Sequence, residues 1–311
     1  MSVPEITRGL RGRRLPAVAV ATCALALLAW VALVEGLVPM PGSGTAMADA
    51  GVVAVDFGTM VDDGTTMGDG TAMDDGTTDS GTVMDPMAPG VVEAMGTSNG
   101  VAGVLGYLLM WGVMMVAMMY PPSAGLFQWY ADRVDRGRQS GTRAHRQPGV
   151  RGGIGADVVA FVGAYTLVWV LVGLVPLVVN LVAPIASLVA TWDGLYYGVG
   201  FLGVAAFQLS PLKRRYLGHC RAPSELLGDR VRPGASNAAG LGWNFGWEDV
   251  GSCGVLMALM VLVGSMNVAW MAIITVVLVL ERLTARGQFW ATAVGVLAGA
   301  AGVVLVVSWL L

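Results

Sequence analysis

Long apolar runs without a single charge are the feature that most constrains this chain. Hydrophobic residues make up 55% of its 311 residues and charged residues only 13%, whereas a soluble domain carries about a quarter charged residues. Uncharged runs of roughly 18 residues or more indicate membrane-spanning helices. The sequence therefore predicts an all-α fold, a polytopic membrane helix bundle whose first partner is the lipid bilayer.

Seven segments of the sequence are apolar enough to cross a membrane as helices. They are residues 15–38, 101–121, 154–182, 187–209, 250–266, 268–283 and 288–310. The fifth and sixth segments share one uncharged run, Gly251 to Leu280, which as a single helix would be about 45 Å long. Because the hydrocarbon core of a bilayer is only about 30 Å thick, the turn-forming residues 264–267 are expected to divide this run into a helical hairpin.

The positive charges predict how these helices are oriented, since cytoplasmic loops are enriched in Lys and Arg. With the N-terminus inside, the cytoplasmic segments hold four, six, six and two of the 18 basic residues, and none lies elsewhere. These segments are 1–14, 131–153, 211–249 and 282–287. The sequence therefore predicts seven transmembrane helices in the cell (plasma) membrane, with the N-terminus inside and the C-terminus outside.

An acidic, methionine-rich segment divides the chain into an N-terminal tail with an anchor helix (1–38), an extracellular loop (39–100) and a six-helix membrane domain (101–311). From Asp49 to Glu93 the loop holds ten acids and no base, so we expect it to be disordered and dispensable for folding. Its methionines suit a copper-gathering arm, since thioethers select Cu(I), or compositional drift in an acidic surface segment. They are Met40, Met47, Met60, Met67, Met73, Met84, Met87 and Met95.

Methionines also form a stripe at helical spacing in the second span, which reads MWGVMMVAMMYPPSAG. Met110, Met114 and Met118 fall within about 80° on one face of a helix. Methionine usually fills irregular core space, although the same side chains could form part of a soft path for a metal ion. Pro121 and Pro122 then predict the end of this helix or a sharp kink.

Three stretches, taken in order, resemble a known family. They are WGVMMVAMMYPPSAG, FQLSPLKRRYLGHCRAP and GSCGVLMALMVLVGSMNVAWMAIITVVLVLERL. These stretches are similar to motifs of the DUF2182 family, whose members are described as predicted metal-binding integral membrane proteins. The resemblance covers about residues 101–310 and implies a six-helix membrane domain that binds a metal. It does not extend to the N-terminal helix or the acidic loop.

The chain departs from this family at positions where the resemblance implies metal-binding thiols. Tyr216 stands four residues before Cys220, where family members tend to carry a cysteine. A Ser-Cys-Gly triplet centred on Cys253 stands where they tend to carry Cys-Cys-Trp. The Glu-Lys pair at the end of the sixth helix is Glu281-Arg282 here. Two of the implied thiolate ligands are therefore missing.

The remaining candidate ligands are expected to meet at the cytoplasmic end of the bundle. The candidate metal site comprises His219, Cys220, Cys253 and Glu281, with Met257, Met114 and Met118 as soft neighbours. Gln208, Glu248 and Asp249 lie at the same membrane level. Two cysteines, a histidine and a carboxylate suit zinc or copper, and two sulfurs on one zinc would lie within about 4 Å. The competing interpretation is an interfacial histidine, packing cysteines, and an ion pair between the glutamate and a nearby arginine.

The functional hypotheses follow from what the sequence contains and lacks. No nucleotide-binding loop, catalytic triad or paired-carboxylate motif occurs in it, and topology explains the basic loops without nucleic acid. No charge is expected deep inside a span, which argues against a proton-coupled pump or an ion channel. The leading hypothesis is the binding or handling of a transition metal, copper or zinc, at the membrane. The alternative is a non-enzymatic structural or assembly subunit that packs against other membrane subunits, and a membrane-embedded metalloenzyme comes third.

Overall fold

The computed structural model of the chain describes residues 17–38, 88–140 and 153–311, and it is built of helices. Within those ranges no strand is present, so the predicted all-helical fold class is confirmed. The elements are α2 Ala17–Val34, α3 Val91–Ser98, α4 Gly100–Ser140, α5 Ile154–Val172, α6 Leu174–Val182, α7 Ile185–Leu209, α8 Pro211–Arg221, α9 Pro223–Leu227, the 3₁₀ helix η3 Gly228–Arg230, α10 Ala235–Val263, α11 Val268–Leu283 and α12 Gly287–Leu310.

Five helical segments among the described residues are long and apolar enough to cross a membrane. They are Ala17–Val34, Gly100–Arg138, Ile154–Val182, Ala235–Val263 and Gly287–Leu310. α7 and α8 add a sixth if they form one span, broken by a bend of 62°. The predicted span 268–283 is the 16-residue helix α11, which is shorter than the roughly 20 residues that a span needs. The chain is a multi-pass membrane protein by length and composition, while the count of seven spans and their orientation stay predictions.

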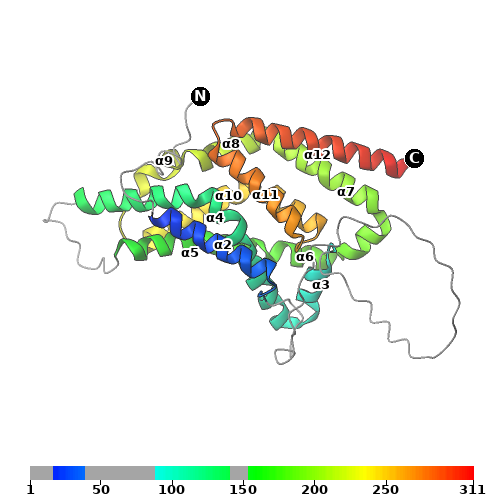
Figure 1. Cartoon of the computed structure of the whole chain (residues 1–311), viewed down its shortest axis with the longest axis horizontal. Helices are drawn as coiled ribbons and strands as arrows, with labels where there is room; N and C mark the ends of the chain where they lie inside the picture. The colour runs from blue at the N-terminus through cyan, green and yellow to red at the C-terminus, as the bar shows by residue number, and fades with distance from the viewer. Residues whose placement is uncertain (1–16, 39–87, 141–152) are drawn as a thin grey trace.

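Helices pack in pairs along the bundle, as Figure 1 shows. α7 packs along α12, α5 along α10 and α2 along α4. Glycines allow two of these close approaches. A Cβ on Gly198 of α7 would lie 3.2 Å from the carbonyl oxygen of Gly302, and a Cβ on Gly242 of α10 would lie 2.1 Å from that of Phe161. Small residues that let two backbones approach are typical of helix pairs in membranes.

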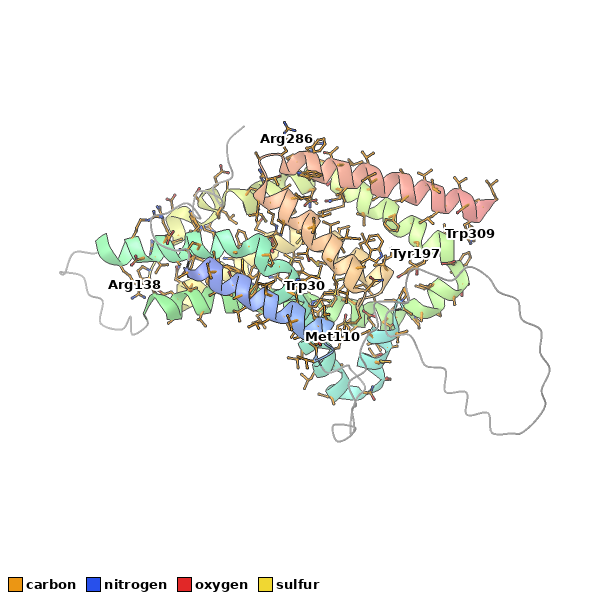
Figure 2. All side chains as sticks on the ribbon, viewed as in Figure 1. Trp30, Met110, Arg138, Tyr197, Arg286 and Trp309 are labelled. Atoms are coloured by element: carbon orange, nitrogen blue, oxygen red, sulfur yellow. The ribbon has the colours of Figure 1, made fainter. Side chains whose placement is uncertain are left out.

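An ion pair joins the end of α4 to the start of α5. Arg138, near the end of α4, forms an ion pair of 2.7 Å with Asp157, near the start of α5. Figure 2 shows Arg138 toward the left end of the molecule, Arg286 at its upper edge near the middle, and Trp309, near the end of α12, toward the right end. Which compartment the basic segments face stays a prediction.

The uncharged run that was predicted to fold as a hairpin is divided by a turn. α10 ends at Val263, and Gly264 follows with a φ of 107°, a conformation that favours glycine. The side chain of Asn267 then caps α11 by accepting a hydrogen bond of 3.1 Å from the backbone N–H of Trp270. The predicted hairpin is therefore present, although its first helix is longer than expected.

Most of the segment 211–249, which was predicted to be a cytoplasmic loop, is helical. Ser210 accepts a hydrogen bond of 3.1 Å from the first turn of α8, and Pro211 occupies the first helical position, where proline is favoured. α10 begins at Ala235 rather than near residue 250. As a result, Asp249 lies in the interior of a helix and not before its start.

α4 continues through Pro121 and Pro122 to Ser140. The prediction that the helix could end at these prolines is therefore wrong. A proline lacks the N–H that would bond the carbonyl four residues earlier. For Pro121 that carbonyl belongs to Ala117, and it accepts a hydrogen bond of 3.0 Å from the indole N–H of Trp30 on α2. A partner from another helix therefore satisfies the oxygen that the proline leaves free.

Part of the segment that was predicted to be a disordered loop (39–100) is helical. α3 spans Val91–Ser98 and buries Glu93 completely. α3 packs against α4 and α6, so its end of the segment belongs to the helical bundle. Residues 39–87, which hold most of the acids and methionines of the segment, lie outside the described residues.

Replacing Gly242 by alanine should lower the thermal stability of the protein in detergent. The added Cβ would meet the carbonyl oxygen of Phe161 at 2.1 Å and push α5 and α10 apart. Overpacking of this kind costs about 1–3 kcal/mol. Gly240→Ala is the matched control on the same helix, because nothing lies within 4 Å of its Cβ and alanine favours helix. Equal melting temperatures for the two variants would contradict the close α5–α10 contact.

Candidate functional site

Asp249, in the interior of α10, is the acceptor around which a buried polar cluster is built. Its side chain is fully buried. Its Oδ2 accepts hydrogen bonds from Tyr165 Oη at 2.5 Å and from Trp169 Nε1 at 3.3 Å, both on α5. Its Oδ1 forms an ion pair with Arg282 of α11. The expectation that no charge lies deep inside a span is therefore wrong, because the helices supply this carboxylate with partners on both oxygens.

The Arg282 guanidinium joins three helices at the same place. It is 2% exposed and donates hydrogen bonds to Ser123 Oγ of α4 at 3.1 Å and to Ser252 Oγ of α10 at 3.2 Å. It also lies 3.3 Å from Cys253 Sγ. With its ion pair to Asp249, the guanidinium is a buried cation surrounded by acceptors, which is what compensates its removal from water.

A second buried ion pair adjoins the first. Lys213 Nζ of α8 lies 2.6 Å from Glu281 Oε2 of α11 and donates to the carbonyl oxygen of Ser252 at 2.7 Å. Gln208 Nε2 of α7 donates to Glu281 Oε1 at 2.8 Å. The competing interpretation of the sequence gave Glu281 an arginine partner, whereas its partner is Lys213, the one lysine of the chain. Two cations and two anions in contact leave this part of the core without net charge.

The two cysteines of the predicted metal site come together at Asp249. Cys220 Sγ of α8 lies 3.5 Å from Asp249 Oδ1, and Cys253 Sγ lies 3.1 Å from the Asp249 carbonyl oxygen, one helical turn earlier. Both thiols are free and at most 1% exposed. The sequence placed them at the same membrane level, and the contact with one shared residue agrees with that placement.

The other two predicted ligands are engaged elsewhere. His219 Nδ1 lies 2.9 Å from Glu248 Oε2, and these side chains are 29% and 28% exposed. The Glu281 carboxylate is held by Lys213 and Gln208. Among the described residues, no three His, Cys, Asp or Glu side chains are grouped as a metal site would require. A site with four ligands drawn from this set is therefore absent from the arrangement of the described residues.

Tyr216, which replaces a cysteine of the family pattern, packs against Gly251. A Cβ on that glycine would lie 2.7 Å from Tyr216 Cε1. The aromatic ring therefore fits beside α10 only because residue 251 is a glycine and has no side chain. The place that the resemblance gives to a thiol is filled by this ring.

The predicted soft neighbours lie in the hydrophobic core. Met114 and Met118 of α4 and Met257 of α10 are at most 1% exposed. Five further methionines are buried in the same core, namely Met110, Met115, Met119, Met260 and Met271. Their thioethers therefore line the interior of the bundle, as both the packing and the soft-path interpretations of the stripe require.

A separate buried acid, Glu93 of α3, lies at the turn between α10 and α11, away from the ion pairs. Its Oε1 accepts hydrogen bonds from Tyr107 Oη at 3.3 Å and from Ser265 Oγ in the α10–α11 turn. Its Oε2 has no hydrogen-bond partner among the described residues. Burial raises the pKa of the Glu93 carboxyl above its usual value of 4.5, against the opposing effect of these hydrogen bonds.

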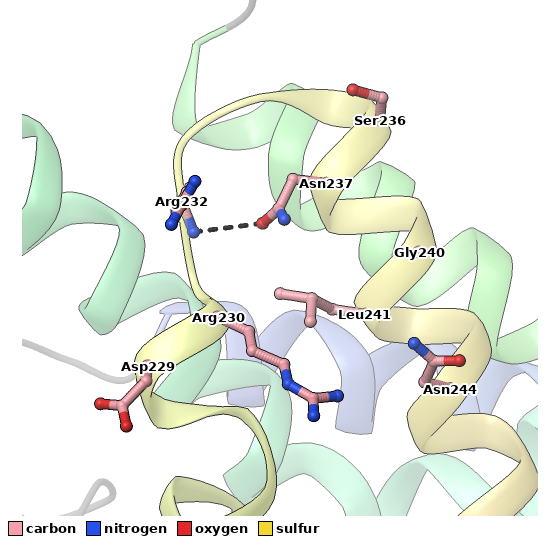
Figure 3. A pocket seen from close by; sticks show the side chains of 8 residues that line it. All are labelled: Asp229, Arg230, Arg232, Ser236, Asn237, Gly240, Leu241 and Asn244. Carbon is pink, nitrogen blue, oxygen red and sulfur yellow. Dashed lines mark hydrogen bonds between the residues drawn. The ribbon is translucent and has the colours of Figure 1, made fainter.

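A surface cavity of about 450 Å³ lies at the start of α10 and contains no sulfur ligand. Figure 3 shows Arg230 reaching toward Leu241, and the Asn237 side chain accepting a hydrogen bond from the backbone of Arg232. The lining residues are Asp229, Arg230, Arg232, Ser236, Asn237, Gly240, Leu241 and Asn244. The thiols of the buried cluster do not open into this cavity.

Sequence reasoning missed the partners that organise the cluster. Asp249 was named as a neighbour of the site but without a role, and Arg282 was treated as a cytoplasmic charge. Lys213 carried a signal, because a single lysine beside a long uncharged run can be retained for one specific contact. Glu93 carried a weaker signal, since apolar residues flank it in VVEAM.

Replacing Asp249 by asparagine should strongly destabilise the protein, because it leaves the buried Arg282 charge unpaired. Breaking one partner of a buried pair costs about 3–5 kcal/mol. Glu248→Gln is the matched control on the same helix, since its pair with His219 is partly exposed and is worth about 0–1 kcal/mol. Thermal unfolding in detergent measures both. Asp249→Leu combined with Arg282→Met should recover much of the loss, and failure of the double variant to do so would contradict a pairwise role.

The raised pKa of Glu93 gives a pH-dependent prediction. The folded state holds the proton more tightly than the unfolded state, so the free energy of unfolding should fall as pH rises from about 4.5 through the raised pKa. Glu93→Gln stays neutral, so it should be more stable than wild type at neutral pH and equal to it below the usual pKa. Melting temperatures across this range measure the difference. Glu225→Gln, at an exposed acid, is the control, and its melting temperature should stay close to that of wild type across this range. A constant difference between Glu93→Gln and wild type would refute the prediction.

Comparison with known proteins shows the family of the chain. The sequence model of the family described as "PpoB2: Copper chaperone" matches residues 108–305. This match covers more than half of the 311 residues, and the chain belongs to this family. It includes Cys220 and Cys253 but not Glu93. No curated protein and no solved structure matches the chain.

Proposed function

From this family membership and the buried thiol pair, we propose that the protein binds copper(I) within its membrane bundle and holds it for transfer, as a copper chaperone of the cell membrane. The observation that carries the proposal is the convergence of Cys220 and Cys253, from different helices, on Asp249. Soft thiolate and thioether ligands select Cu(I). The thiols and the methionine-rich core supply both kinds of ligand in a site without access to bulk water.

The ligands at hand support copper(I) over zinc. Structural zinc is bound almost always by four ligands in a tetrahedron, and no group of three His, Cys, Asp or Glu side chains occurs among the described residues. His219 bonds Glu248 and Glu281 bonds Lys213, so neither is free to complete such a site. Cu(I) is held by as few as two soft ligands. In this proposal Cys220 and Cys253 are the ligands, whereas His219 and Glu281 support the helices around them.

The Arg282 guanidinium lies beside the thiols. It touches Cys253 Sγ and pairs with Asp249. Thiols lose their protons when they bind a metal, so two thiolates and one copper(I) ion would carry one net negative charge. Arg282 is the nearby cation that can balance this charge without leaving the cluster. The proposal therefore assigns Arg282 the role of a counter-charge, not of a competitor that must exit.

The methionines extend the site into the core. Met257 lies one helical turn beyond Cys253 on α10, and Met114 and Met118 lie in the same core on α4. Thioethers stay neutral and bind copper(I) more weakly than thiolates do. They suit a route by which the ion reaches or leaves the thiol pair. The structural or assembly role remains the alternative if the thiols prove not to bind copper.

Copper(I) binding to purified full-length protein in detergent tests the proposal. Under ascorbate, with bathocuproine disulfonate as competitor, Cys220→Ser and Cys253→Ser should each weaken binding at the thiol site by more than about tenfold, because even outer-shell partners are worth 10–100-fold. Cys23→Ser, on α2, is the matched control and should bind like wild type. Unchanged copper affinity in both cluster variants, with melting temperatures near that of wild type, would refute the proposal.

A further inference from the structure

The surface cavity at the start of α10 is lined by two arginines whose charges are not paired. Arg230 and Arg232 both line this cavity of about 450 Å³, and both are exposed. No ion pair among the described residues includes either of them. Cavities that bind small ligands have volumes of about 300–1,000 Å³. The cavity therefore combines room for a ligand with positive charge that lacks a counter-ion in the described part of the chain.

One carboxylate also lines the cavity, and it cannot neutralise both guanidinium groups. Two arginines and one aspartate, Asp229, leave the lining with one net positive charge. Figure 3 shows the Asp229 carboxylate directed away from Asn237 and from α10, whereas the Arg230 side chain extends toward α10. The part of the cavity beside α10 is therefore the part that favours an anion.

Neutral donors on α10 complete this lining. The Oδ1 atom of Asn237 accepts a hydrogen bond of 3.1 Å from the backbone N–H of Arg232, which leaves the amide NH₂ group of Asn237 as a donor. Ser236 and Asn244 add a hydroxyl group and a second amide. Guanidinium groups bind phosphate oxygens with two parallel hydrogen bonds. The lining therefore matches a phosphate group in both its charge and its donors.

The length of α10 places the cavity at the level of the lipid headgroups. α10 has 29 residues, whereas about 20 residues cross the hydrocarbon core of a bilayer. Counted back from Val263, where α10 ends, those 20 residues reach Asn244. The turns of α10 that precede Asn244 therefore extend beyond the hydrocarbon, and these turns line the cavity.

Two exposed tryptophans lie next to the cavity on the same helix. Trp243 is 37% exposed and Trp247 is 47% exposed, and their rings meet edge to face with centroids 6.1 Å apart. Tryptophan is enriched where a membrane meets water, because one part of its ring system is apolar and the other is polar. Trp243 directly precedes Asn244, which lines the cavity. An apolar surface suited to the upper part of an acyl chain thus adjoins the donors for a phosphate.

We propose that this cavity binds the phosphate headgroup of an anionic phospholipid. Arg230 and Arg232 hold the phosphate, and the acyl chains lie against Trp243 and Trp247. The site is separate from the proposed copper site and does not depend on it. It lies on the connection between α8 and α10, the two helices that carry the buried thiols, so a bound lipid would stabilise the segment that links them.

Lipid binding to the purified full-length protein in detergent tests the proposal. Native mass spectrometry measures the affinity for the first molecule of dioleoyl phosphatidylglycerol. Arg230→Gln/Arg232→Gln should weaken this affinity by about tenfold or more, because it removes both charged donors. Arg230→Lys/Arg232→Lys should fall between this variant and wild type, since lysine keeps the charge but not the paired hydrogen bonds. Arg214→Gln/Arg215→Gln, at exposed positions of α8 outside the cavity, is the matched control and should bind like wild type.

Gly240 provides a test that leaves the charge of the cavity unchanged. A Cβ at this lining position would meet nothing within 4 Å, so Gly240→Leu should fill the cavity without displacing a neighbour, and leucine favours helix. The variant should bind phosphatidylglycerol about tenfold more weakly, while its melting temperature without lipid should not fall below that of wild type. Gly203→Leu, at an exposed glycine of α7 with equally open surroundings, is the control and should bind like wild type.

Comparison of three ligands distinguishes a lipid headgroup from free phosphate. Phosphatidylglycerol should raise the melting temperature of wild type, whereas phosphatidylcholine should not, because its choline cation cancels the phosphate charge. Inorganic phosphate should not displace the bound lipid more than sodium chloride of equal ionic strength does, because it lacks the apolar part. Stronger displacement by phosphate, without stabilisation by phosphatidylglycerol, would assign the cavity to free phosphate and overturn the lipid proposal. Unchanged affinity for phosphatidylglycerol in Arg230→Gln/Arg232→Gln or in Gly240→Leu would overturn the site itself.

Discussion

Two neighbouring ion pairs, Asp249–Arg282 and Lys213–Glu281, hold the centre of this membrane protein together. Their side chains and hydrogen-bond partners come from α4, α5, α7, α8, α10 and α11. Inside a bilayer no water can replace a missing partner, and each buried charge repays its desolvation only when its whole set of contacts is formed. The six helices are therefore constrained to one mutual arrangement, which also fixes where the two thiols lie.

The same cluster shows how the chain differs from the pattern that its motifs resemble. Where a thiol is implied at residue 216, a tyrosine ring packs on Gly251. Beside Cys253, where a second thiol is implied, the hydroxyl of Ser252 accepts a hydrogen bond from Arg282. Both replacements substitute packing or neutral hydrogen bonding for potential thiolates. What they leave is a pair of thiols with one adjacent guanidinium, an arrangement suited to an ion that needs few soft ligands.

Local signals in the sequence predicted the helices, whereas contacts between distant segments decided the rest. The uncharged runs and the turn at Gly264–Asn267 were sufficient for the hairpin, because both are properties of consecutive residues. The passage of α4 through Pro121 could not be predicted, since it depends on the indole of Trp30 from another helix. The helical start of α10 was also missed, because the polar residues of the segment hid its helical character.

The candidate site divides in the same way. Placing Cys220 and Cys253 at one membrane level followed from counting spans and charges, and the structure joins them through Asp249. The partners of His219 and Glu281 did not follow, because either residue had several polar neighbours at that level and only packing selects among them. Glu93 was assigned to a disordered loop from the composition of the segment. Composition averages over many residues, so it does not detect a single buried acid flanked by apolar residues.

Charge balance explains why a core rich in thioethers should contain ionisable groups. The eight buried methionines of the described residues would pack no better than leucines of similar volume, and they add no charge that needs a partner. Their sulfur atoms matter only to a soft cation, and such a cation can enter the core only where an anion meets it. The thiols of Cys220 and Cys253 can supply that anion by losing their protons, and the adjacent Arg282 guanidinium can balance the charge that results.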